Sequence, residues 1–481
     1  MDQLERRLNR RSFVKGIAAT AAVAAMTPLL AACGGDDDDD SGSTSDSTAT
    51  TGGSTGSSAT ATGGGSTVSA TTASSGSGSG GERVKVVYWG SFSDALGEAE
   101  QEVVKRFNES QQDVEVEYQF QGNYEETAQK LTQALAADQA PDVSLLSDVW
   151  WFKFYVNQKL APLNEFISAS GLDTSDYVDS LYIEGVRNDT TFWLPFARST
   201  PLFYFNRDAF AEAGLPDRGP ETWDEFMEWA PELVTMDGST VSRSAFAHPG
   251  AASYIAWLFQ GAIWQFNGRY SDPDFTVRIA EPEGIAAGEF YKASVGDGWA
   301  TTPVDINADF TNQLTCAMMA STGGLKGIQE TATFEVGTSF LPEMEAFGCP
   351  TGGAGLAVLS TSPREKQEAA FKFIEFATSP ETTTYWSQNT GYMPVRKSAF
   401  SSPEMTEFFT TNPNFKTAVD QLAKTQPQDA ARVFIPGGDQ IIGKGLERVT
   451  INQEDVASVF ADVQAELEAE AKPVLESMES L

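Results

Sequence analysis

The residue best suited to bind a charged group is Arg432, which lies in the mainly apolar stretch "ARVFIPGGD". A guanidinium group among hydrophobic side chains needs an anionic partner, because an unpaired buried charge is strongly unfavourable. Tyr124 and Asp148 each follow a segment with the character of a strand, "VEVEYQF" and "PDVSLLS". Ligands of open α/β sheets bind beyond the carboxyl ends of the strands, which is where both residues fall. Alternatively, Asp148 could cap a helix beginning near Val149, and Tyr124 could be a half-buried helix residue.

Enzyme chemistry finds little support in the sequence. His248 is the only histidine, so a Ser-His-Asp triad or a zinc site with several imidazoles would depend on it alone. It lies in "FAHPG", and we expect a solvated loop residue. Asp142 and Asp148 could be the paired carboxylates of a hydrolase, but nothing places a second acid opposite Asp148. The "TGGAG" segment is not followed by the Lys-Ser/Thr of a phosphate-binding loop. We therefore expect a binding protein without cofactor or metal.

The composition narrows the possible partners. The 481 residues include 67 Asp and Glu against 32 Lys and Arg, a net charge of -35. Such a surface repels nucleic acid and anionic lipid headgroups. The 31 Phe, 12 Tyr and 10 Trp residues nevertheless provide for a large folded core.

The first 33 residues have the pattern of an export signal. The sequence "RRSFVK", which resembles a twin-arginine motif, precedes the apolar stretch 17–32. This stretch is too short and too rich in alanine for a membrane span. It ends in "LAAC", which is similar to a bacterial lipobox, and in that family the cysteine receives diacylglycerol. Residues 1–33 are therefore expected to be a lipoprotein signal peptide that ends at Cys33.

Residues 34–81 contain only Gly, Ser, Thr, Ala, Asp and one Val. Such a composition cannot bury enough apolar surface to fold, so we expect a disordered linker. A flexible coil of this length would span roughly 40 Å. With Cys33 acylated, the protein would be lipid-anchored on the extracytoplasmic face of the cell membrane, and its folded part would stand clear of the bilayer.

The folded part begins with alternating strands and helices. The segments 84–90, 114–120 and 141–147 have the β-branched and aromatic content of strands. Between them, apolar residues recur at helical spacing near 96–107, and 124–137 also reads as a helix. This order predicts a parallel sheet with right-handed crossovers.

The same pattern resumes later in the chain. Residues 202–215 predict a strand followed by a helix, 221–233 predict another helix, and 455–478 predict a long amphipathic helix. "CAMMAS" and "GAGLAVLS" are apolar strands. Cys316 and Cys349 could form a disulfide outside the cytoplasm, but each also fits a small buried apolar position, and we favour two free thiols.

Several segments occur in an order that identifies a family. They are "GNYEETAQKL", "APDVSLLSD", "PFARSTPLFYFNRDAF", "CAMMASTGGLKGI", "PTGGAGLAVL" and "TGYMPVRKSAF". Together they resemble the extracellular solute-binding proteins of ABC importers over essentially all of residues 82–481. The segments "ARSTPLFYFN", "LPDRGP" and "ARVFIPGGDQII" are similar to the branch that binds glycerol 3-phosphate and glycerophosphodiesters such as glycerophosphocholine.

The resemblance implies an α/β fold of the two-lobed periplasmic-binding-protein type (type II), whose hinge-linked lobes close on a ligand in the cleft between them. The first lobe is expected in residues 82–197 and 356–391, and the second in 203–350 and 396–481. "PFARSTP", "PTGGAG" and "TGYMP" would cross between the lobes, since they carry the Pro and Gly that irregular hinge backbone needs. The implied partners are a small-molecule ligand and an ABC permease in the membrane, and we expect a monomer.

The resemblance also implies particular ligand contacts. Tyr124 and Asp148 would bind glycerol hydroxyls, since a carboxylate can accept hydrogen bonds from a diol. Tyr392 would offer a phenolic donor from the hinge. Trp257 would present its indole face to a quaternary ammonium group by cation–π attraction.

The phosphate would have its own set of donors. Ser199, Ser321 and the backbone N–H of Gly353 would donate to its oxygens, and Arg432 would add a charge-assisted contact. Two positions depart from the enteric glycerol-3-phosphate pattern: Asp148 replaces a Glu, and Ile442 replaces a basic residue. One arginine in so acidic a domain suits a singly charged diester better than a dianionic monoester. We therefore favour a glycerophosphodiester, with glycerol 3-phosphate or an oligosaccharide as the alternative.

Overall fold

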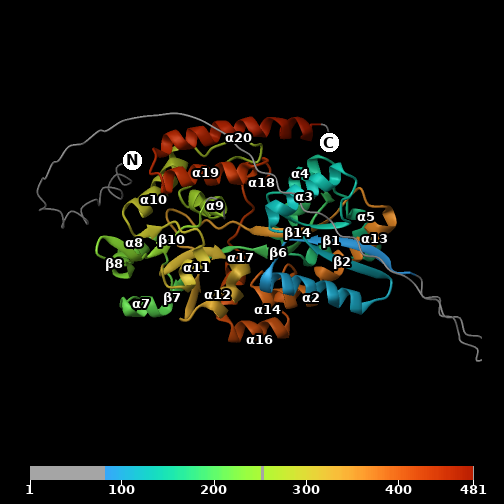
Figure 1. The fold of residues 1–481 in the computed structure, drawn as a ribbon, viewed down its shortest axis with the longest axis horizontal. Coiled ribbons are helices and arrows are strands. Elements are labelled where there is room, and N and C mark those ends of the chain that lie inside the picture. The colour runs from blue at the N-terminus through green and yellow to red at the C-terminus, as the bar shows by residue number, and fades with distance from the viewer. Residues whose placement is uncertain (1–81, 251–253, 480–481) are drawn as a thin grey trace, which may run out of the picture. The chain divides into compact units, whose positions relative to one another are not determined.

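The computed structural model describes residues 82–250 and 254–479 (Figure 1). The expected signal peptide, Cys33 and the expected linker lie outside these residues. Within the described part of the chain, no helix combines the length and apolar character that a membrane crossing requires.

The first of two five-stranded sheets has the order β2-β1-β3-β14-β6. Its strands are β1 (Val84–Gly90), β2 (Val114–Phe120), β3 (Val143–Ser147), β6 (Leu194–Ser199) and β14 (Gly352–Val358). The predicted parallel pairing is confirmed for β1 with β2 and β3. β14 instead runs antiparallel to both β3 and β6, because the chain enters it from β13 of the second sheet and not through a helical crossover.

Helices cover both faces of this sheet. α2 (Asp94–Ser110) and α3 (Tyr124–Ala136) lie on opposite sides of the strands (Figure 1). The central strand β3 is buried throughout, with Leu145 in the core cluster of α2 and Leu146 in that of α3. A continuous apolar strand of this kind is expected wherever a sheet is covered on both faces.

The second sheet has the order β11-β10-β12-β7-β13. Its strands are β7 (Pro201–Asn206), β10 (Phe246–Ala247), β11 (Ala300–Thr301), β12 (Ala317–Ser321) and β13 (Val336–Ser339). β10 pairs in parallel with β11 and β12, whereas β7 is antiparallel to β12 and β13. Two hairpins complete the strands: β4 (Val186–Arg187) with β5 (Thr190–Thr191), and β8 (Thr235–Asp237) with β9 (Thr240–Arg243).

The other helices follow the chain in two groups. Those before β14 are α4 (Trp151–Val156), α5 (Asn164–Ser170), η1 (Thr174–Asp176), α6 (Asp179–Tyr182), η2 (Ile183–Gly185), α7 (Arg207–Glu212), α8 (Trp223–Leu233), α9 (Ile255–Gln265), α10 (Pro282–Gly296), α11 (Ile306–Thr311), η3 (Thr322–Gly324) and α12 (Leu325–Thr331). Those after β14 are α13 (Arg364–Ala377), α14 (Pro380–Thr390), α15 (Lys397–Phe400), α16 (Pro403–Thr411), α17 (Pro413–Leu422), α18 (Ala430–Val433), α19 (Gly438–Thr450) and α20 (Val456–Met478).

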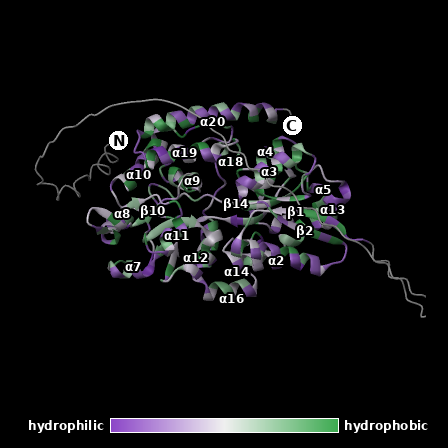
Figure 2. Ribbon diagram, in the orientation of Figure 1, coloured by the Kyte–Doolittle hydropathy of each residue, from purple (hydrophilic) through white to green (hydrophobic). Residues whose placement is uncertain are grey.

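The amphipathic pattern of the last helix is confirmed. Green and purple residues alternate along α20 in Figure 2, and its buried residues include Val459, Phe460 and Val463. The Asp455 side chain caps the helix by accepting a hydrogen bond from the backbone N–H of Ser458. The apolar face packs against α19.

The chain passes between the two sheets near the predicted crossings. Thr200 alone separates β6 from β7, and residues 340–351 lead from β13 to β14. The third predicted crossing lies against the first, since the backbone N–H of Met393 donates to the Arg198 carbonyl at 2.8 Å. The limits expected for each lobe, 82–197 with 356–391 and 203–350 with 396–481, stay a prediction.

The expectation for His248 is wrong. The side chain is completely buried, with Nε2 2.8 Å from Ser294 Oγ and the ring centroid 4.2 Å from that of Tyr291. It directly follows β10, an internal strand of the second sheet, so the backbone carries it into the core. Burial lowers its pKa to about 3, which keeps the imidazole neutral. Cys316 and Cys349, in contrast, are free buried thiols as predicted.

Candidate ligand-binding site

Five of the predicted contacts lie at strand ends or at the first turn of a helix. Tyr124 is the first residue of α3, and Asp148 follows β3 directly. Ser199 ends β6, Ser321 ends β12, and Gly353 lies at the start of β14. These elements belong to both sheets and meet where the chain crosses between them.

A capping box fixes the position of Tyr124. The Asn123 side chain accepts a hydrogen bond from the backbone N–H of Glu126 at 3.0 Å, and the Glu126 carboxylate accepts one from the backbone N–H of Asn123 at 2.9 Å. The helix therefore begins at Tyr124, directly after the turn that follows β2.

Tyr124 and Tyr392 form a pair of phenols. Their hydroxyl oxygens are 3.3 Å apart, and Phe92 packs against both rings at a centroid distance of 5.7 Å. The Tyr392 ring stacks on Trp386 with an interplanar angle of 15°. Burial raises the pKa of Tyr124 well above its usual value and that of Tyr392 to about 12. Both phenols therefore remain protonated near neutral pH, and each can donate a hydrogen bond.

Asp148 is tied to the crossing strand by its backbone and not to a helix. Its N–H donates to the Gly353 carbonyl at 2.9 Å. The alternative that it caps a helix is wrong, because α4 begins only at Trp151 and has Trp150 at its N-cap position. The carboxylate accepts a hydrogen bond from Gln428 Nε2 at 2.6 Å and lies 3.7 Å from Arg432 Nη1.

Gly353 allows this close approach of backbones. Its φ is +107°, and a Cβ atom at this position would lie 2.1 Å from the Ala197 carbonyl oxygen. A residue with a side chain would therefore be strained here and would separate the two crossing segments.

Arg432 is buried and has anionic partners, as its apolar surroundings predicted. It lies in α18 with 5% exposure, and its Nε donates to Asp439 Oδ1 at 2.7 Å. Nη1 donates to the side-chain oxygen of Gln428 and also faces Asp148. Burial raises the pKa of Asp439, an effect that Arg432 opposes.

The two predicted serines differ in their surroundings. Ser199 is buried and lies opposite Gly352 in the pairing of β6 with β14. Ser321 caps η3, since its hydroxyl accepts a hydrogen bond from the Gly323 N–H at 3.1 Å. Its carbonyl accepts one from the Tyr204 hydroxyl at 2.8 Å.

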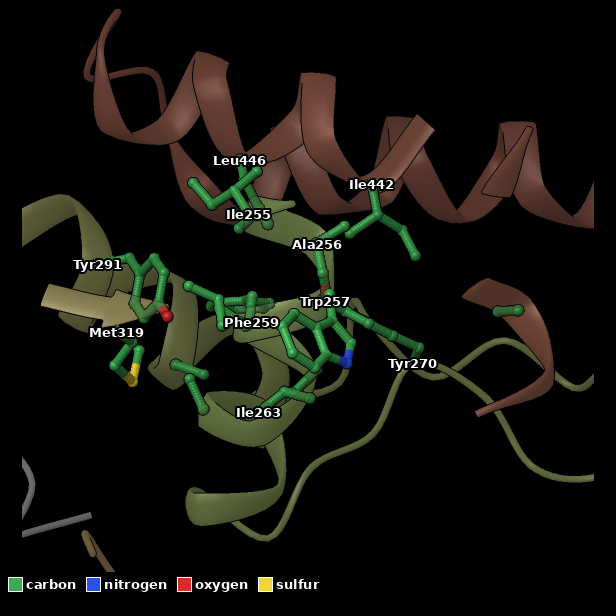
Figure 3. Packing of buried hydrophobic residues seen from close by; sticks show 14 of the residues in the cluster. Ile255, Ala256, Trp257, Phe259, Ile263, Tyr270, Tyr291, Met319, Ile442 and Leu446 are labelled. Carbon is green, nitrogen blue, oxygen red and sulfur yellow. The ribbon is translucent and has the colours of Figure 1, made fainter. Parts of the chain in front are cut away.

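Trp257 is anchored at the edge of a hydrophobic core (Figure 3). It comes from α9, and its indole N–H donates to the Thr351 carbonyl at 2.9 Å. Its ring lies against Gly352, where a Cβ would approach it to 2.6 Å, and only 5% of the residue is exposed. The indole therefore links α9 to the segment that enters β14.

Four further residues complete this polar cluster, and sequence reasoning did not single them out. They are Glu184, Arg198, Thr351 and Gln428. Glu184 accepts a hydrogen bond from Thr351 Oγ1 and an ion-pair contact from Arg198 Nη2, both at 2.5 Å. Burial raises the pKa of Glu184, with Arg198 opposing the shift. Arg198 precedes Ser199, a predicted contact, in "ARSTP". This adjacency was the one signal in the sequence for any of the four residues.

Two other features lie apart from the cluster. Asp142, suggested above as half of a carboxylate pair, is bound by Ser362 at 2.7 Å and Lys366 at 3.0 Å at the opposite end of β3 from Asp148. A surface hollow of about 610 Å³ is lined by Arg207, Arg218 and Lys424, among others, and by none of the predicted contacts. We place the candidate site at the polar cluster and not at this hollow, because the charged and hydrogen-bonding groups of the cluster can recognise a ligand.

Comparison with known proteins agrees with the fold. Residues 102–417 match the family of bacterial extracellular solute-binding proteins, and the chain belongs to that family. It is thus a solute-binding protein of the kind that serves ABC importers, and it is not an enzyme.

Particular relatives are similar over most of the chain. The crystal structure of UgpB from Mycobacterium tuberculosis in complex with glycerophosphocholine has a TM-score of 0.78 and 42% identity, covering 82% of this chain and 100% of that one. The sn-glycerol-3-phosphate-binding periplasmic protein UgpB of Escherichia coli K12 is 26% identical, over 71% of this chain and 81% of its own length. The GacH receptor of Streptomyces glaucescens, whose structure was determined with acarbose, has a TM-score of 0.70 and 19% identity. The match covers 82% of this chain and 99% of that one, and at this identity it indicates only the two-lobed fold.

Proposed function

We propose that this protein captures a glycerophosphodiester, such as glycerophosphocholine, and delivers it to an ABC permease. The observation that carries the proposal is the placement of Arg432 opposite Asp148, 3.7 Å apart, at the crossing between the lobes. A guanidinium group suits one phosphate charge, and a carboxylate suits the hydroxyls of a glycerol. The relative with 42% identity was crystallised with glycerophosphocholine, which supports the same ligand class.

The proposed roles of the other contacts follow this arrangement. Tyr124 would join Asp148 at the glycerol end, with Tyr392 as a further donor at the hinge. Ser199, Ser321 and the N–H of Gly353 would lie at the phosphate. Trp257, of which 5% is exposed, would present its indole face to the choline group.

A glycerol 3-phosphate ligand is the second candidate, because the relative from Escherichia coli bears that specificity in its name. Arg432 already faces two carboxylates, Asp148 and Asp439. These three groups together carry one net negative charge, so they would repel a dianionic phosphate more strongly than a monoanionic diester. This charge balance favours the diester.

The proposal extends to the location of the protein. The twin-arginine signal and lipobox pattern support export and acylation at Cys33, with 34–81 as tether and the permease as partner in the membrane. Capture would require the proposed lobes to close, and the closed form would be recognised by the permease.

Calorimetric titration of the full chain with glycerophosphocholine, glycerol 3-phosphate and maltose tests the ligand. We expect saturable binding of the diester and much weaker binding of the other two. Arg432→Ala should reduce diester affinity about 10-fold to 150-fold, since a charged hydrogen bond contributes about 1.5–3 kcal/mol.

Arg448→Ala is the matched control, because Arg448 pairs with Glu454 and Asp462 on the surface. It should bind as the unmodified protein does. Undiminished affinity in a folded Arg432→Ala protein would contradict the assigned role of Arg432, and binding of maltose alone would contradict the ligand class.

A further inference from the structure

Gln428 occupies the space between the two groups assigned to the ligand. Its Nε2 donates to Asp148 Oδ2 at 2.6 Å and to the Thr351 carbonyl at 2.8 Å. Its Oε1 accepts a hydrogen bond from Arg432 Nη1. One side chain thereby bridges the carboxylate that follows β3 and the guanidinium of α18.

The side-chain amide of Gln428 offers Asp148 and Arg432 the same kinds of hydrogen-bonding groups as the proposed ligand would. A glycerophosphodiester presents hydroxyl donors to a carboxylate and a phosphate oxygen acceptor to a guanidinium. The Gln428 amide presents an N–H donor to Asp148 and a carbonyl acceptor to Arg432. Because the amide is neutral, it satisfies both buried charges without changing the net charge of the site.

The backbone on both sides of Gln428 is fixed. Gln426 pairs with the crossing segment, since its N–H donates to the Cys349 carbonyl and its carbonyl accepts from the Thr351 N–H, both at 3.2 Å. On the other side, Asp429 Oδ2 accepts hydrogen bonds from Gln260 Nε2 at 2.8 Å and the Tyr270 N–H at 2.7 Å. A ligand can therefore displace the Gln428 side chain through its rotatable bonds while the backbone stays in place.

We infer that Gln428 is an affinity-determining residue that acts as an internal substitute for the ligand. In the free protein its amide binds Asp148 and Arg432, and a ligand that enters between them must displace it. This inference rests on the proposed function for the identity of the ligand. The intramolecular contacts themselves do not depend on that identity.

Two substitutions at this position test the inference by calorimetric titration of the full chain with glycerophosphocholine. Gln428→Ala should bind about threefold to tenfold more tightly, because about one net hydrogen bond no longer has to be broken. Gln428→Glu should bind about tenfold more weakly, since its carboxylate would pair with Arg432 and repel the phosphate. Gln426→Ala is the control and should bind unchanged, because Gln426 joins the crossing segment through its backbone.

Opposite shifts in the two variants support the inference. Weaker binding by both would mean that Gln428 contacts the ligand directly, and unchanged affinity in Gln428→Ala would mean that no displacement occurs. Either result overturns it.

The side-chain amide of Gln428 gives a second readout in glutamine-labelled protein, where its NMR signal is the one absent from Gln428→Ala. We expect slow exchange with water in the free protein and a large shift on saturation with ligand. If none of glycerophosphocholine, glycerol 3-phosphate and maltose binds, the proposed function fails, and amide exchange alone decides the inference. A protected amide then supports the bridge between Asp148 and Arg432 that the inference requires, and a rapidly exchanging one overturns the inference.

Discussion

At the scale of single residues, Glu100 is a buried acid close to the Tyr124–Tyr392 pair. It has 1% exposure and accepts hydrogen bonds from the hydroxyls of Tyr88 and Tyr118, the latter at 2.8 Å. Burial raises its pKa from the ordinary 4.5 to about 7, although the phenol hydrogen bonds act in the opposite direction. The folded protein therefore holds this proton more tightly than the unfolded chain does.

This shift predicts how stability depends on pH. A raised carboxyl pKa stabilises the fold fully below the unfolded value of about 4.5, and the contribution is lost as pH rises through about 7. At about 1.4 kcal/mol per pKa unit, the rise from 4.5 to about 7 corresponds to a loss of at most about 3–4 kcal/mol. Glu100→Gln, which stays neutral, should show a flatter profile of unfolding free energy between about pH 5 and 7 in denaturant titrations, within the span that these pKa values set.

Glu98→Gln is the control, because Glu98 lies exposed on the same helix. Its pH profile should follow that of the unmodified protein. An equally steep profile in Glu100→Gln would mean that another group carries the pH dependence.

At the scale of elements, the crossing strand β14 supports the site through Gly353. Its carbonyl binds the backbone of Asp148, and its positive φ brings it close to Ala197. A side chain here would separate two segments that both carry predicted ligand contacts.

Gly353→Ala should therefore lower both stability and affinity. We expect a loss of about 1–3 kcal/mol in unfolding free energy from backbone strain, with further loss from the clash at Ala197. Diester affinity should fall as well, because Asp148 would no longer be held in place. Thermal unfolding and calorimetric titration measure the two effects.

Gly327→Ala is the matched control. Gly327 lies inside α12, and an added Cβ would meet no atom within 4 Å. It should leave affinity unchanged and raise stability by about 0.5–1 kcal/mol. Unimpaired folding and binding in Gly353→Ala would contradict the role of β14 in positioning Asp148.

Local sequence patterns predicted the elements well where local physics determines them. β1 and β2 have the predicted bounds, and α20 differs by one residue, because alternation, helical spacing and capping act within a few neighbours. The direction of β14, the burial of His248 and the backbone role of Asp148 depend on segments far away in the chain. Gln428 is the clearest case: its partners Asp148 and Thr351 lie 280 and 77 residues away, and no local pattern marks such contacts.

At the scale of the whole molecule, the net charge of -35 acts on any charged ligand before it reaches Arg432. Glycerophosphocholine carries a phosphodiester and a quaternary ammonium and is neutral overall, whereas glycerol 3-phosphate is an anion. The long-range field should therefore repel the second ligand and leave the first nearly unaffected. The acidic surface would in this way add kinetic selectivity to the contacts of the cleft.

This selectivity predicts that the association rates of the two ligands differ in their dependence on salt. The Debye screening length, which sets the range of this field, is about 30 Å at 0.01 M salt but only about 8 Å at 0.15 M. Stopped-flow tryptophan fluorescence should therefore show faster association of glycerol 3-phosphate as salt rises over this range, with little change for glycerophosphocholine. A glycerol 3-phosphate rate that falls with salt would mean that the positive charge of Arg432 dominates the approach. In that case the cleft itself, and not the surrounding surface, would determine which ligand enters.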